Sequence, residues 1–230
     1  MQPYFLPYIG YWQLLNAVDS YVIYDDVNYI KGGWINRNRI LIDGEVKYFN
    51  VQLKEASPNK LINEVCVDCN EKIINKKLRT IENAYNKAPQ FERVYPLIKN
   101  IMQCNESNLA DFLTKSIVEI CKYLNIDTKI IVSSELPKDN SVKGQAKVLD
   151  ICQLLGASEY YNAIGGQELY SFEEFKSRGI ELKFLKTEDV IYNQGKEHIA
   201  SNLSILDVLM HNSVDKISEY LHSYNLITER

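Results

Sequence analysis

The stretch from Gln2 to Arg39 most constrains the fold, because it concentrates prolines, glycines, adjacent carboxylates and both tryptophans of the chain. Pro3 and Pro7 exclude a helix at the start, since proline lacks an amide hydrogen and keeps the preceding residue extended. Residues 11–18 have the apolar spacing of a short helix, and residues 21–24 are a β-branched and aromatic run typical of a buried strand. A loop, a helix and a strand in this order are half of a βαβ unit, whose missing strand is expected before Gln2.

Two adjacent carboxylates, Asp25 and Asp26, follow this predicted strand directly. In open α/β sheets, ligands bind beyond the carboxyl ends of strands, so the pair and the opening loop form one candidate site. Adjacent carboxylates can hold a metal ion, orient an amine or hydroxyl group, or act as a general base; alternatively, one of them caps the following turn. The residues of the opening loop that we expect to contact a ligand are Gln2, Pro3, Tyr4, Pro7, Tyr8 and Gly10.

A glycine pair and two arginines come next. Gly32 and Gly33 let the backbone approach a ligand closely, and arginines two residues apart on an extended segment suit a carboxylate or phosphate. The alternative is a solvated strand face, with Trp34 and Ile35 packed inward. The candidate binding residues of this segment are Lys31, Trp34, Asn36, Arg37, Asn38 and Arg39.

Length and composition fit a single domain over residues 1–230, with 46% hydrophobic and 24% charged residues. The net charge of −4 argues against a protein held to nucleic acid by phosphate contacts. No apolar run reaches the roughly 18 residues that a membrane span needs, and no signal sequence is recognisable. The five cysteines form no metal motif and fit a reducing cytoplasm; a homo-oligomer is compatible with all of these features.

The middle of the chain carries structural signals and no chemistry of its own. Arg39 to Leu53 reads as a hairpin around Asp43-Gly44, and residues 61–67 as a short strand. Apolar spacing predicts helices over residues 72–88, 91–102 (interrupted near its start by Pro96) and 108–124. We therefore expect a helical insertion or lid over residues 70–126.

An α/β pattern returns in the second half of the chain. Strands are predicted over residues 128–132, 158–162 and 180–185, with helices over residues 146–155 and 172–178 between them. The order β-α-β-α-β implies parallel pairing with right-handed crossovers. The expected fold class is α/β, with a Rossmann-like parallel sheet, the helical insertion and a C-terminal helical segment.

Two later loops should reach the same sheet edge as the opening loop. A serine, a lysine and a glycine at a helix start resemble an anion site, although Ser141 is also an ordinary capping residue. The second loop contains another glycine pair. The candidate binding residues of the two loops are Ser141, Lys143, Gly144, Gln145, Asn162, Gly165, Gly166 and Tyr170. Among the three histidines, His198 is the best acid–base candidate, because it lies in a polar loop after the last predicted strand.

Four segments resemble the WbqC-like family: QPYFLPYIGYWQLLNAVDSYVIYDDVNYIKGGWINRNRI, SVKGQAKVLDIC, GASEYYNAIGGQELY and NLSILDVLMHNS. The resemblance covers nearly the whole chain. It implies a role in bacterial surface polysaccharide biosynthesis, such as that of the O-antigen of lipopolysaccharide, and a glycine or aminoacyl transferase activity. In that hypothesis Asp25 or Asp26 accepts a proton from the amine of a nucleotide-activated amino sugar. Lys31, Arg37 and Arg39 would hold its phosphate or carboxylate groups.

The order of loop, helix and acidic strand end is also similar to the start of nucleotidylyltransferase-like Rossmann folds and pantothenate synthetases. This similarity implies a ligase or nucleotidyltransferase that uses ATP and Mg²⁺. Lys143 and Gln2 would then contact phosphates, and Asp25 or Asp26 would help hold the metal. The paired histidines of that signature are absent here. A third hypothesis is a non-catalytic sugar-nucleotide binding protein or pathway scaffold.

Overall fold

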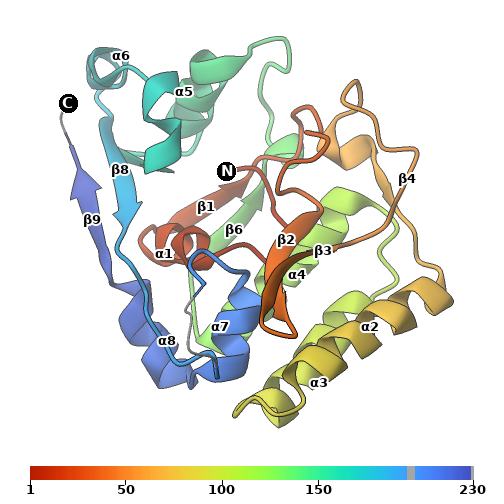
Figure 1. Cartoon of the computed structure of the whole chain (residues 1–230). Coiled ribbons are helices and arrows are strands. Elements are labelled where there is room, and N and C mark those ends of the chain that lie inside the picture. The colour runs from red at the N-terminus through yellow and green to blue at the C-terminus, as the bar shows by residue number, and fades with distance from the viewer. Residues whose placement is uncertain (196–199, 229–230) are drawn as a thin grey trace.

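The computed structural model describes residues 1–195 and 200–228, which form a mixed α/β fold with helices around small sheets (Figure 1). The helices are α1 (Ile9–Asn16), α2 (Glu71–Tyr85), α3 (Phe91–Met102), α4 (Leu109–Leu124), α5 (Gly144–Leu154), α6 (Phe172–Ser177), α7 (Ile205–His211) and α8 (Val214–Leu221). The strands are β1 (Ser20–Ile23), β2 (Arg37–Ile42), β3 (Glu45–Asn50), β4 (Leu53–Lys54), β5 (Cys66–Val67), β6 (Lys129–Val132), β7 (Glu159–Ala163), β8 (Glu181–Thr187) and β9 (Tyr224–Ile227). Short 3₁₀ turns are η1 (Ile62–Glu64), η2 (Ser133–Glu135) and η3 (Ile164–Leu169).

Among the described residues, the strands form two parallel pairs and three antiparallel pairs. Strand β1 pairs with β6 in parallel, and β7 pairs with β8 in parallel, with β9 added antiparallel to β8. Strands β2 and β3 form the predicted hairpin, and β4 pairs with β5. Because β1 and β6 are parallel, their carboxyl ends lie at the same edge of this sheet, and the acidic residues that follow β1 lie there too.

The parallel order predicted for the second half of the chain is confirmed only in part. The expected helices and strands form, but β6 pairs with β1, and β7 pairs with β8. Among the described residues, β6 and β7 share no ladder, so one continuous Rossmann-like sheet is not observed. Residues of both β1 and β7 line a cavity, which lies between the two parallel pairs.

Local signals predicted most element boundaries well. The side chain of Asn108 accepts a hydrogen bond from the amide of Ala110 and starts α4, and Ser204 caps α7 in the same way. Two predictions need correction. The strand expected at residues 61–67 is reduced to β5 behind the turn η1. Pro96 lies inside α3 without interrupting it, because buried apolar side chains on both sides hold the helix together.

Aromatic side chains near the start of the chain anchor the larger hydrophobic core. The ring of Phe5 lies 6.0 Å from those of Phe49 and Phe112, which brings β3 and α4 against the opening loop. Trp12 is fully buried and donates its indole N–H to the carbonyl of Pro7. A smaller core lies between α5, α6 and the β7–β8 pair. Among the described residues, no helix is both long and apolar enough to cross a bilayer.

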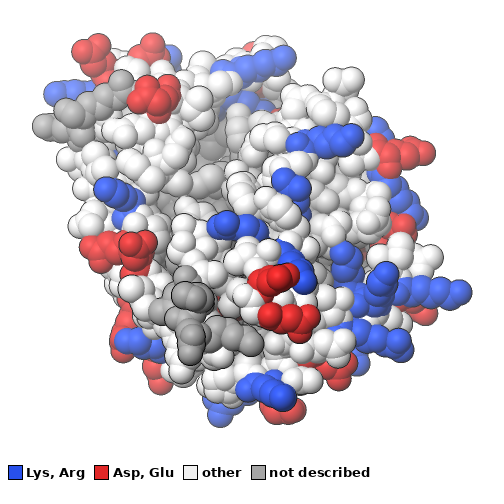
Figure 2. Space-filling view, in the orientation of Figure 1, with Lys and Arg blue, Asp and Glu red and all other residues white. Residues whose placement is uncertain are grey.

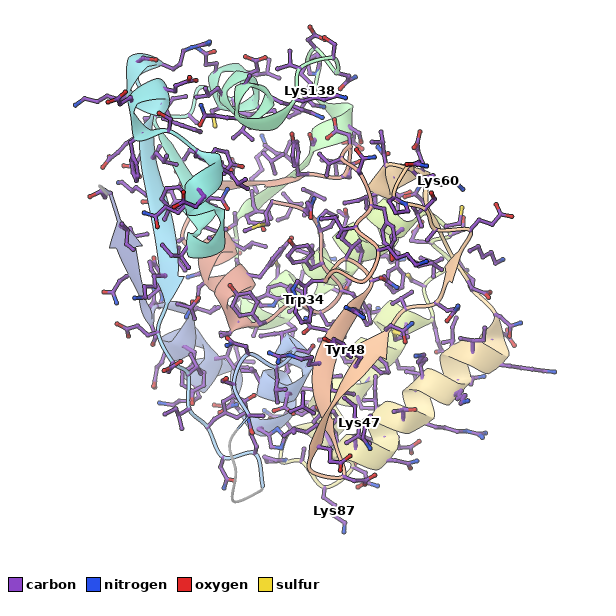
Figure 3. The ribbon with its side chains drawn as sticks, turned by 45° about the horizontal axis from the view of Figure 1, so that its top comes forward. Trp34, Lys47, Tyr48, Lys60, Lys87 and Lys138 are labelled. Atoms are coloured by element: carbon purple, nitrogen blue, oxygen red, sulfur yellow. The ribbon has the colours of Figure 1, made fainter. Side chains whose placement is uncertain are left out.

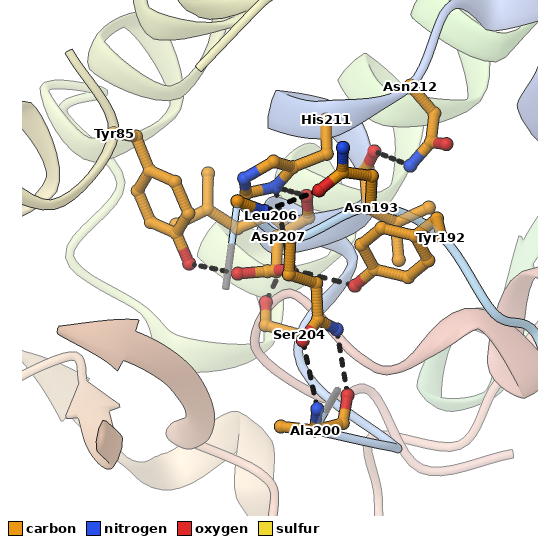
Figure 4. A network of polar contacts seen from close by, with 12 residues as sticks. Tyr85, Tyr192, Asn193, Ala200, Ser204, Leu206, Asp207, His211 and Asn212 are labelled. Carbon is orange, nitrogen blue, oxygen red and sulfur yellow. Dashed lines mark hydrogen bonds and ion pairs between the residues drawn. The ribbon is translucent and has the colours of Figure 1, made fainter. Parts of the chain in front are cut away.

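A fully buried carboxylate, Asp207, joins α7 to distant segments (Figure 4). The hydroxyls of Tyr85 and Tyr192 each donate to it over 2.8 Å. Burial, followed by the negative charge of Asp207, raises the pKa of both tyrosines, so they remain protonated donors. The ring nitrogen Nδ1 of His211 lies 2.9 Å from the backbone oxygen of Asp207. The network fixes α2 and the segment around Tyr192 to α7.

Gly10 marks a close approach between the start of α1 and the end of β8. An added Cβ at this position would overlap Thr187 Oγ1 and the ring of Tyr8. We expect Gly10→Ala to lower the free energy of unfolding by about 1–3 kcal/mol, as overpacked core substitutions do. Urea denaturation measures the change. Gly165→Ala is the matched control, because nothing described lies within 4 Å of its Cβ position. Equal stability of the two variants would contradict the packing described here.

Candidate functional site at the carboxyl ends of β1 and β6

The first of the two acidic residues, Asp25, holds three segments together. It is 1% exposed, and its Oδ1 accepts a hydrogen bond from the amide of Ser134 over 3.0 Å. Its Oδ2 accepts from the hydroxyl of Ser134 over 2.6 Å and from the side-chain amide of Asn63 over 3.2 Å. Both carboxylate oxygens are therefore engaged with η1 and η2, and we assign Asp25 a structural role at the end of β1.

The second acidic residue, Asp26, is the shared partner of two buried lysines. Its Oδ2 lies 2.8 Å from the ammonium of Lys138 and 2.9 Å from that of Lys147. Lys147 also donates to the backbone oxygen of Asp26 over 3.1 Å, and Lys138 donates to the carbonyl of Ser133. The side chains of Asp26, Lys138 and Lys147 are only 9%, 3% and 7% exposed. We call these three side chains the lysine–aspartate cluster.

The lysine–aspartate cluster favours an ionised carboxylate. Burial opposes ionisation of Asp26, but hydrogen bonds from Lys138 and Lys147, with the nearby Ser133 hydroxyl, outweigh it and hold the pKa below its usual value. With both lysines protonated, the cluster carries one net positive charge. Oδ1 of Asp26 is buried and has no hydrogen-bond partner among the described residues. The cluster thus contains a buried acceptor oxygen beside positive charge, with the buried Ser133 hydroxyl nearby.

Tyr24 connects the lysine–aspartate cluster with a cavity. Its ring centroid lies 5.0 Å from the ammonium of Lys147, and its side chain lines the cavity wall. Burial and the charge of Asp26 raise the pKa of Tyr24, so its hydroxyl stays protonated at neutral pH. Lysine and aspartate therefore lie directly behind the tyrosine that faces the open space.

The cavity has a volume of about 1300 Å³ and lies between β1 and β7. Residues from all three predicted loops line it, together with the strand edges. The predicted site residues among them are Gln2, Tyr4, Tyr8, Trp34, Gly144, Gln145, Asn162, Gly165, Gly166 and Tyr170. Figure 2 shows a hollow near the middle of one face, with lysine and arginine side chains close to it. The loops thus meet around a common space.

Other residues of the opening loop shape the loop and do not line the cavity. Pro3, Pro7 and Gly10 are buried. The carbonyl of Pro7 accepts hydrogen bonds from the indole of Trp12 and the amide of Ile205. These residues therefore set the path of the loop that carries Gln2, Tyr4 and Tyr8 to the cavity.

The segment of residues 31–39 divides into internal and exposed side chains. Asn36 accepts a hydrogen bond from the hydroxyl of Tyr29 and donates one to the carbonyl of Val51. Asn38 donates to the carbonyl of Leu6, so both asparagines hold the backbone in place. The exposed side chains are Lys31 and Trp34, with Arg37 and Arg39 partly exposed beside them.

Arginines and aromatic rings form one outer face of the β2–β3 hairpin. The guanidinium of Arg37 lies 4.3 Å from the ring centroid of Tyr48, and that of Arg39 lies 5.8 Å from Trp34. The rings of Trp34 and Tyr48 are neighbours, 6.3 Å apart (Figure 3). Since Trp34 also lines the cavity, this face adjoins the cavity rim.

Among the described residues, no side chain at the N-cap position of α5 makes a capping hydrogen bond. The N-cap position is Lys143, whose exposed side chain makes no capping hydrogen bond. The backbone amide of Ser141 donates a hydrogen bond to Oδ1 of Asp139. Gln145 bonds Glu174 and the amide of Ser171, which fixes α5 against α6. The start of α5 is therefore uncapped, as the predicted anion site requires. Ser141 does not cap the helix, since the N-cap position is Lys143.

Sequence reasoning missed the two lysines of the cluster. Lys147 lies on the buried face of α5 with Val148 and Ile151, where a lysine is unexpected. That position in an apolar stripe was the available signal. Lys138 lies in an irregular loop and had no comparable signal.

The donor set does not fit a magnesium ion. Asp25 is engaged by protein donors, and the Oδ2 of Asp26 faces two ammonium groups, which would repel a divalent cation. Among the described residues, no group of three or more histidine, cysteine, aspartate or glutamate side chains could hold a metal ion. The candidate His198 lies outside the described residues.

Parallel strands with charged residues beyond their carboxyl ends define an α/β protein with a polar site at a sheet edge. The chain belongs to the WbqC-like protein family, whose sequence model matches residues 2–219. The uncharacterized protein Rv1507c of Mycobacterium tuberculosis (strain ATCC 25618 / H37Rv) is 25% identical over 213 residues, covering 91% of this chain and 90% of that protein. No solved structure matches the chain. The family resemblance read from the sequence motifs is confirmed.

The structural role of Asp25 predicts a loss of stability on substitution. In Asp25→Asn, an amide group replaces one acceptor oxygen opposite Ser134 and Asn63. We expect the free energy of unfolding to fall by about 1–3 kcal/mol, the usual cost of leaving buried donors unpaired. Asp150→Asn is the control, because the side chain of Asp150, on α5, has no hydrogen-bond partner among the described residues. A stable Asp25→Asn variant that has lost only activity would instead make Asp25 a reactive residue.

The lowered pKa of Asp26 predicts a pH dependence of stability. Because the folded state favours the carboxylate, its contribution is fully present above the unfolded pKa of about 3.9 and is lost as pH falls through the lower folded pKa. Wild type should therefore lose more unfolding free energy below about pH 4 than Asp26→Asn does. Urea denaturation between about pH 5 and pH 2.5 tests this. Parallel pH curves for the two proteins would refute it.

Proposed function

We propose that this protein is a transferase that attaches an acyl or aminoacyl (glycyl-type) group to the amino group of a nucleotide-activated sugar in bacterial surface polysaccharide biosynthesis. Membership of the WbqC-like family supports the pathway and the class of reaction proposed here. The observation that carries the chemistry is the lysine–aspartate cluster, with its free acceptor atom and net positive charge beyond β1 and β6.

The lysine–aspartate cluster suits acyl transfer to an amine. The cluster is buried behind Tyr24 and does not itself line the cavity, so this chemistry requires the ring of Tyr24 to move aside. Oδ1 of Asp26 would then accept a hydrogen bond from the attacking amine and stabilise the positive charge that develops on its nitrogen. The ammonium groups of Lys138 and Lys147 would stabilise the oxyanion that forms at the acyl carbon. A carbon–nitrogen bond forms, the bond to the leaving group breaks, and the amine proton passes through Asp26 to the leaving group. Because its pKa is low, Asp26 would hold that proton only briefly.

The rim of the cavity supports a substrate that is both anionic and cyclic. Arg37 and Arg39 supply guanidinium groups that suit phosphates, and Lys31 is exposed nearby in sequence. Trp34 and Tyr48 offer ring faces and edges for a base or a sugar. A nucleoside diphosphate amino sugar combines these features, with its amine as the acceptor.

A second candidate is an ATP-using ligase or nucleotidyltransferase. The observation that favours it is the uncapped start of α5 at Lys143 and Gly144, where free amide groups can hold phosphate. The poor fit of Asp25 and Asp26 to Mg²⁺ weighs against it. Binding without turnover would leave a sugar-nucleotide binding protein as the third reading.

Lys147 and Lys143 provide a matched pair of substitutions on one helix. We expect Lys147→Met to lower kcat/KM by about 10²–10³-fold, because one donor to the developing oxyanion is removed. Lys143→Met changes an exposed lysine at the helix start and should retain most of the activity. The assay incubates a nucleoside diphosphate amino sugar with acyl and aminoacyl donors and follows the amide product by mass spectrometry.

The same proteins distinguish the alternatives in a thermal-shift experiment. Stabilisation of the wild type by the amino-sugar nucleotide without Mg²⁺ supports the transferase. Stabilisation by ATP and Mg²⁺ alone, lost in Lys143→Met and retained in Lys147→Met, would overturn it in favour of the ligase. Binding of the sugar nucleotide with no amide product from any donor would support the binding protein.

A further inference from the structure

Exposed apolar side chains lie next to one another on the β2–β3 hairpin and the loop before it. Of the nine large apolar side chains that are exposed among the described residues, four lie here: Ile30, Trp34, Val46 and Tyr48. A Cβ atom on Gly33 would lie 3.1 Å from Cγ2 of Ile30, so Ile30 packs against the residue before Trp34. The rings of Trp34 and Tyr48 are 6.3 Å apart, and Val46 shares one face of β3 with Tyr48. We call these four side chains the hairpin patch.

Three basic groups border the hairpin patch. Lys31 is exposed in the loop, and the guanidinium of Arg37 lies over the ring of Tyr48. The guanidinium of Arg39 lies 5.8 Å from the ring centroid of Trp34. Both guanidinium groups donate to backbone carbonyls, which fixes their positions without neutralising their charge. None of the three basic groups has an acidic partner among the described residues, so their charges remain available to an anion.

The hairpin and its loop carry a surplus of positive charge. Residues 30–50 contain four basic and two acidic side chains. The acidic residues, Asp43 and Glu45, lie at the hairpin turn, and Glu45 pairs with Lys47 over 3.1 Å. Figure 3 shows Trp34, Tyr48 and Lys47 in succession along the hairpin. Because a second copy of this patch would bring like charges together, the surplus fits an anionic partner instead.

We propose that the hairpin patch is a peripheral membrane-binding surface, which contacts the headgroup region of an anionic lipid bilayer. Tryptophan and tyrosine are enriched in this region, because their rings are apolar while the indole N–H and the phenol hydroxyl stay hydrated. The aliphatic side chains of Ile30 and Val46 enter the boundary between headgroups and acyl chains. Lys31 and the two arginines face the lipid phosphates.

The size of the hairpin patch favours a membrane over a protein partner. A stable protein interface buries roughly 800 Å² on each partner, which is much more than the exposed parts of four side chains supply. A peripheral membrane contact needs only a few apolar anchors together with basic groups that attract anionic lipids. An exposed group of apolar side chains with a polar border is typical of such an interaction site.

The membrane contact is independent of the proposed transferase chemistry, although the two surfaces adjoin. Ile30 and Trp34 also line the cavity, so a bound bilayer would lie beside the cavity rim. The proposed substrate site uses the rings of Trp34 and Tyr48 and the basic groups, but assigns no role to Val46 or Lys47. Substitutions at these last two positions therefore test the membrane contact without changing a proposed substrate contact.

Tryptophan fluorescence gives the first readout, because Trp12 is fully buried and Trp34 is exposed in the hairpin patch. Vesicles of phosphatidylcholine and phosphatidylglycerol in equal parts should shift the emission to shorter wavelength, and brominated acyl chains should quench it. Vesicles of phosphatidylcholine alone should cause little change. Added salt should weaken binding, because it screens the attraction between basic side chains and lipid phosphates. Trp34→Phe should remove the shift, since Trp12 does not reach the lipid.

Sedimentation with the same vesicles compares two matched substitutions. Val46→Glu should weaken binding at least about fivefold, because it places a carboxylate among anionic headgroups. Lys47→Glu should weaken it as well. Leu154→Glu is the control, because Leu154 is 45% exposed and Val46 is 46% exposed, but Leu154 lies on α5. This control should bind the vesicles as the wild type does, and all three variants should keep the wild-type Tm, since the changed side chains are exposed.

Two results would overturn the proposal: no sedimentation of the wild type with anionic vesicles, or equal binding by Val46→Glu and Leu154→Glu. A dimer seen by light scattering without vesicles, and lost in Val46→Glu, would also overturn it and show a second copy on the patch. Binding of a nucleotide sugar, measured without vesicles, is a separate readout that Val46→Glu should retain. Failure of the membrane contact and failure of the proposed transferase are therefore distinguishable.

Discussion

The site depends on the hydrogen bonds of one buried carboxylate. Asp25 accepts from the backbone and hydroxyl of Ser134 and from Asn63, so it joins the end of β1 to the turns η2 and η1. Because Asp26 is the next residue, its position relative to the loop that carries Lys138 follows from these bonds. Two adjacent residues of one type therefore have different tasks. One fixes the backbone, and its neighbour faces the lysines with one oxygen unused.

Two buried ammonium groups that share one carboxylate are not expected to increase the stability of the fold. Taking charges out of water costs several kcal/mol per ion, and a single carboxylate neutralises only one of them. Apolar residues of similar size would pack in the same place without that cost. The residual positive charge is useful only where a negative group arrives or develops, and low surrounding polarity strengthens its effect. This desolvation cost, which apolar packing would avoid, is the reason that the proposed function assigns the chemistry to the lysine–aspartate cluster.

Local sequence signals predicted much of the fold, whereas partners across the chain were harder to foresee. Apolar spacing and capping residues such as Asn108 placed the long helices, and Asp43-Gly44 placed the hairpin turn. The pairing of β6 with β1 was not predicted, because periodicity indicates which residues are buried without naming the strand beside them. The same limit applies to the site: Asp25 and Asp26 look alike in sequence, and only their partners distinguish them. Lys147 was overlooked because a lysine within an apolar helix stripe is uncommon.

The separation of the site residues along the chain has a consequence for synthesis. Asp25 and Ser134 are 109 residues apart, and Asp26 and Lys147 are 121 apart. Contacts between such distant residues form slowly, because a long loop must close before they contribute. While the ribosome is still making β6, the carboxylates after β1 have neither their serine nor their lysine partners. The acidic pair therefore gains the last of its partners only after residue 147 has emerged.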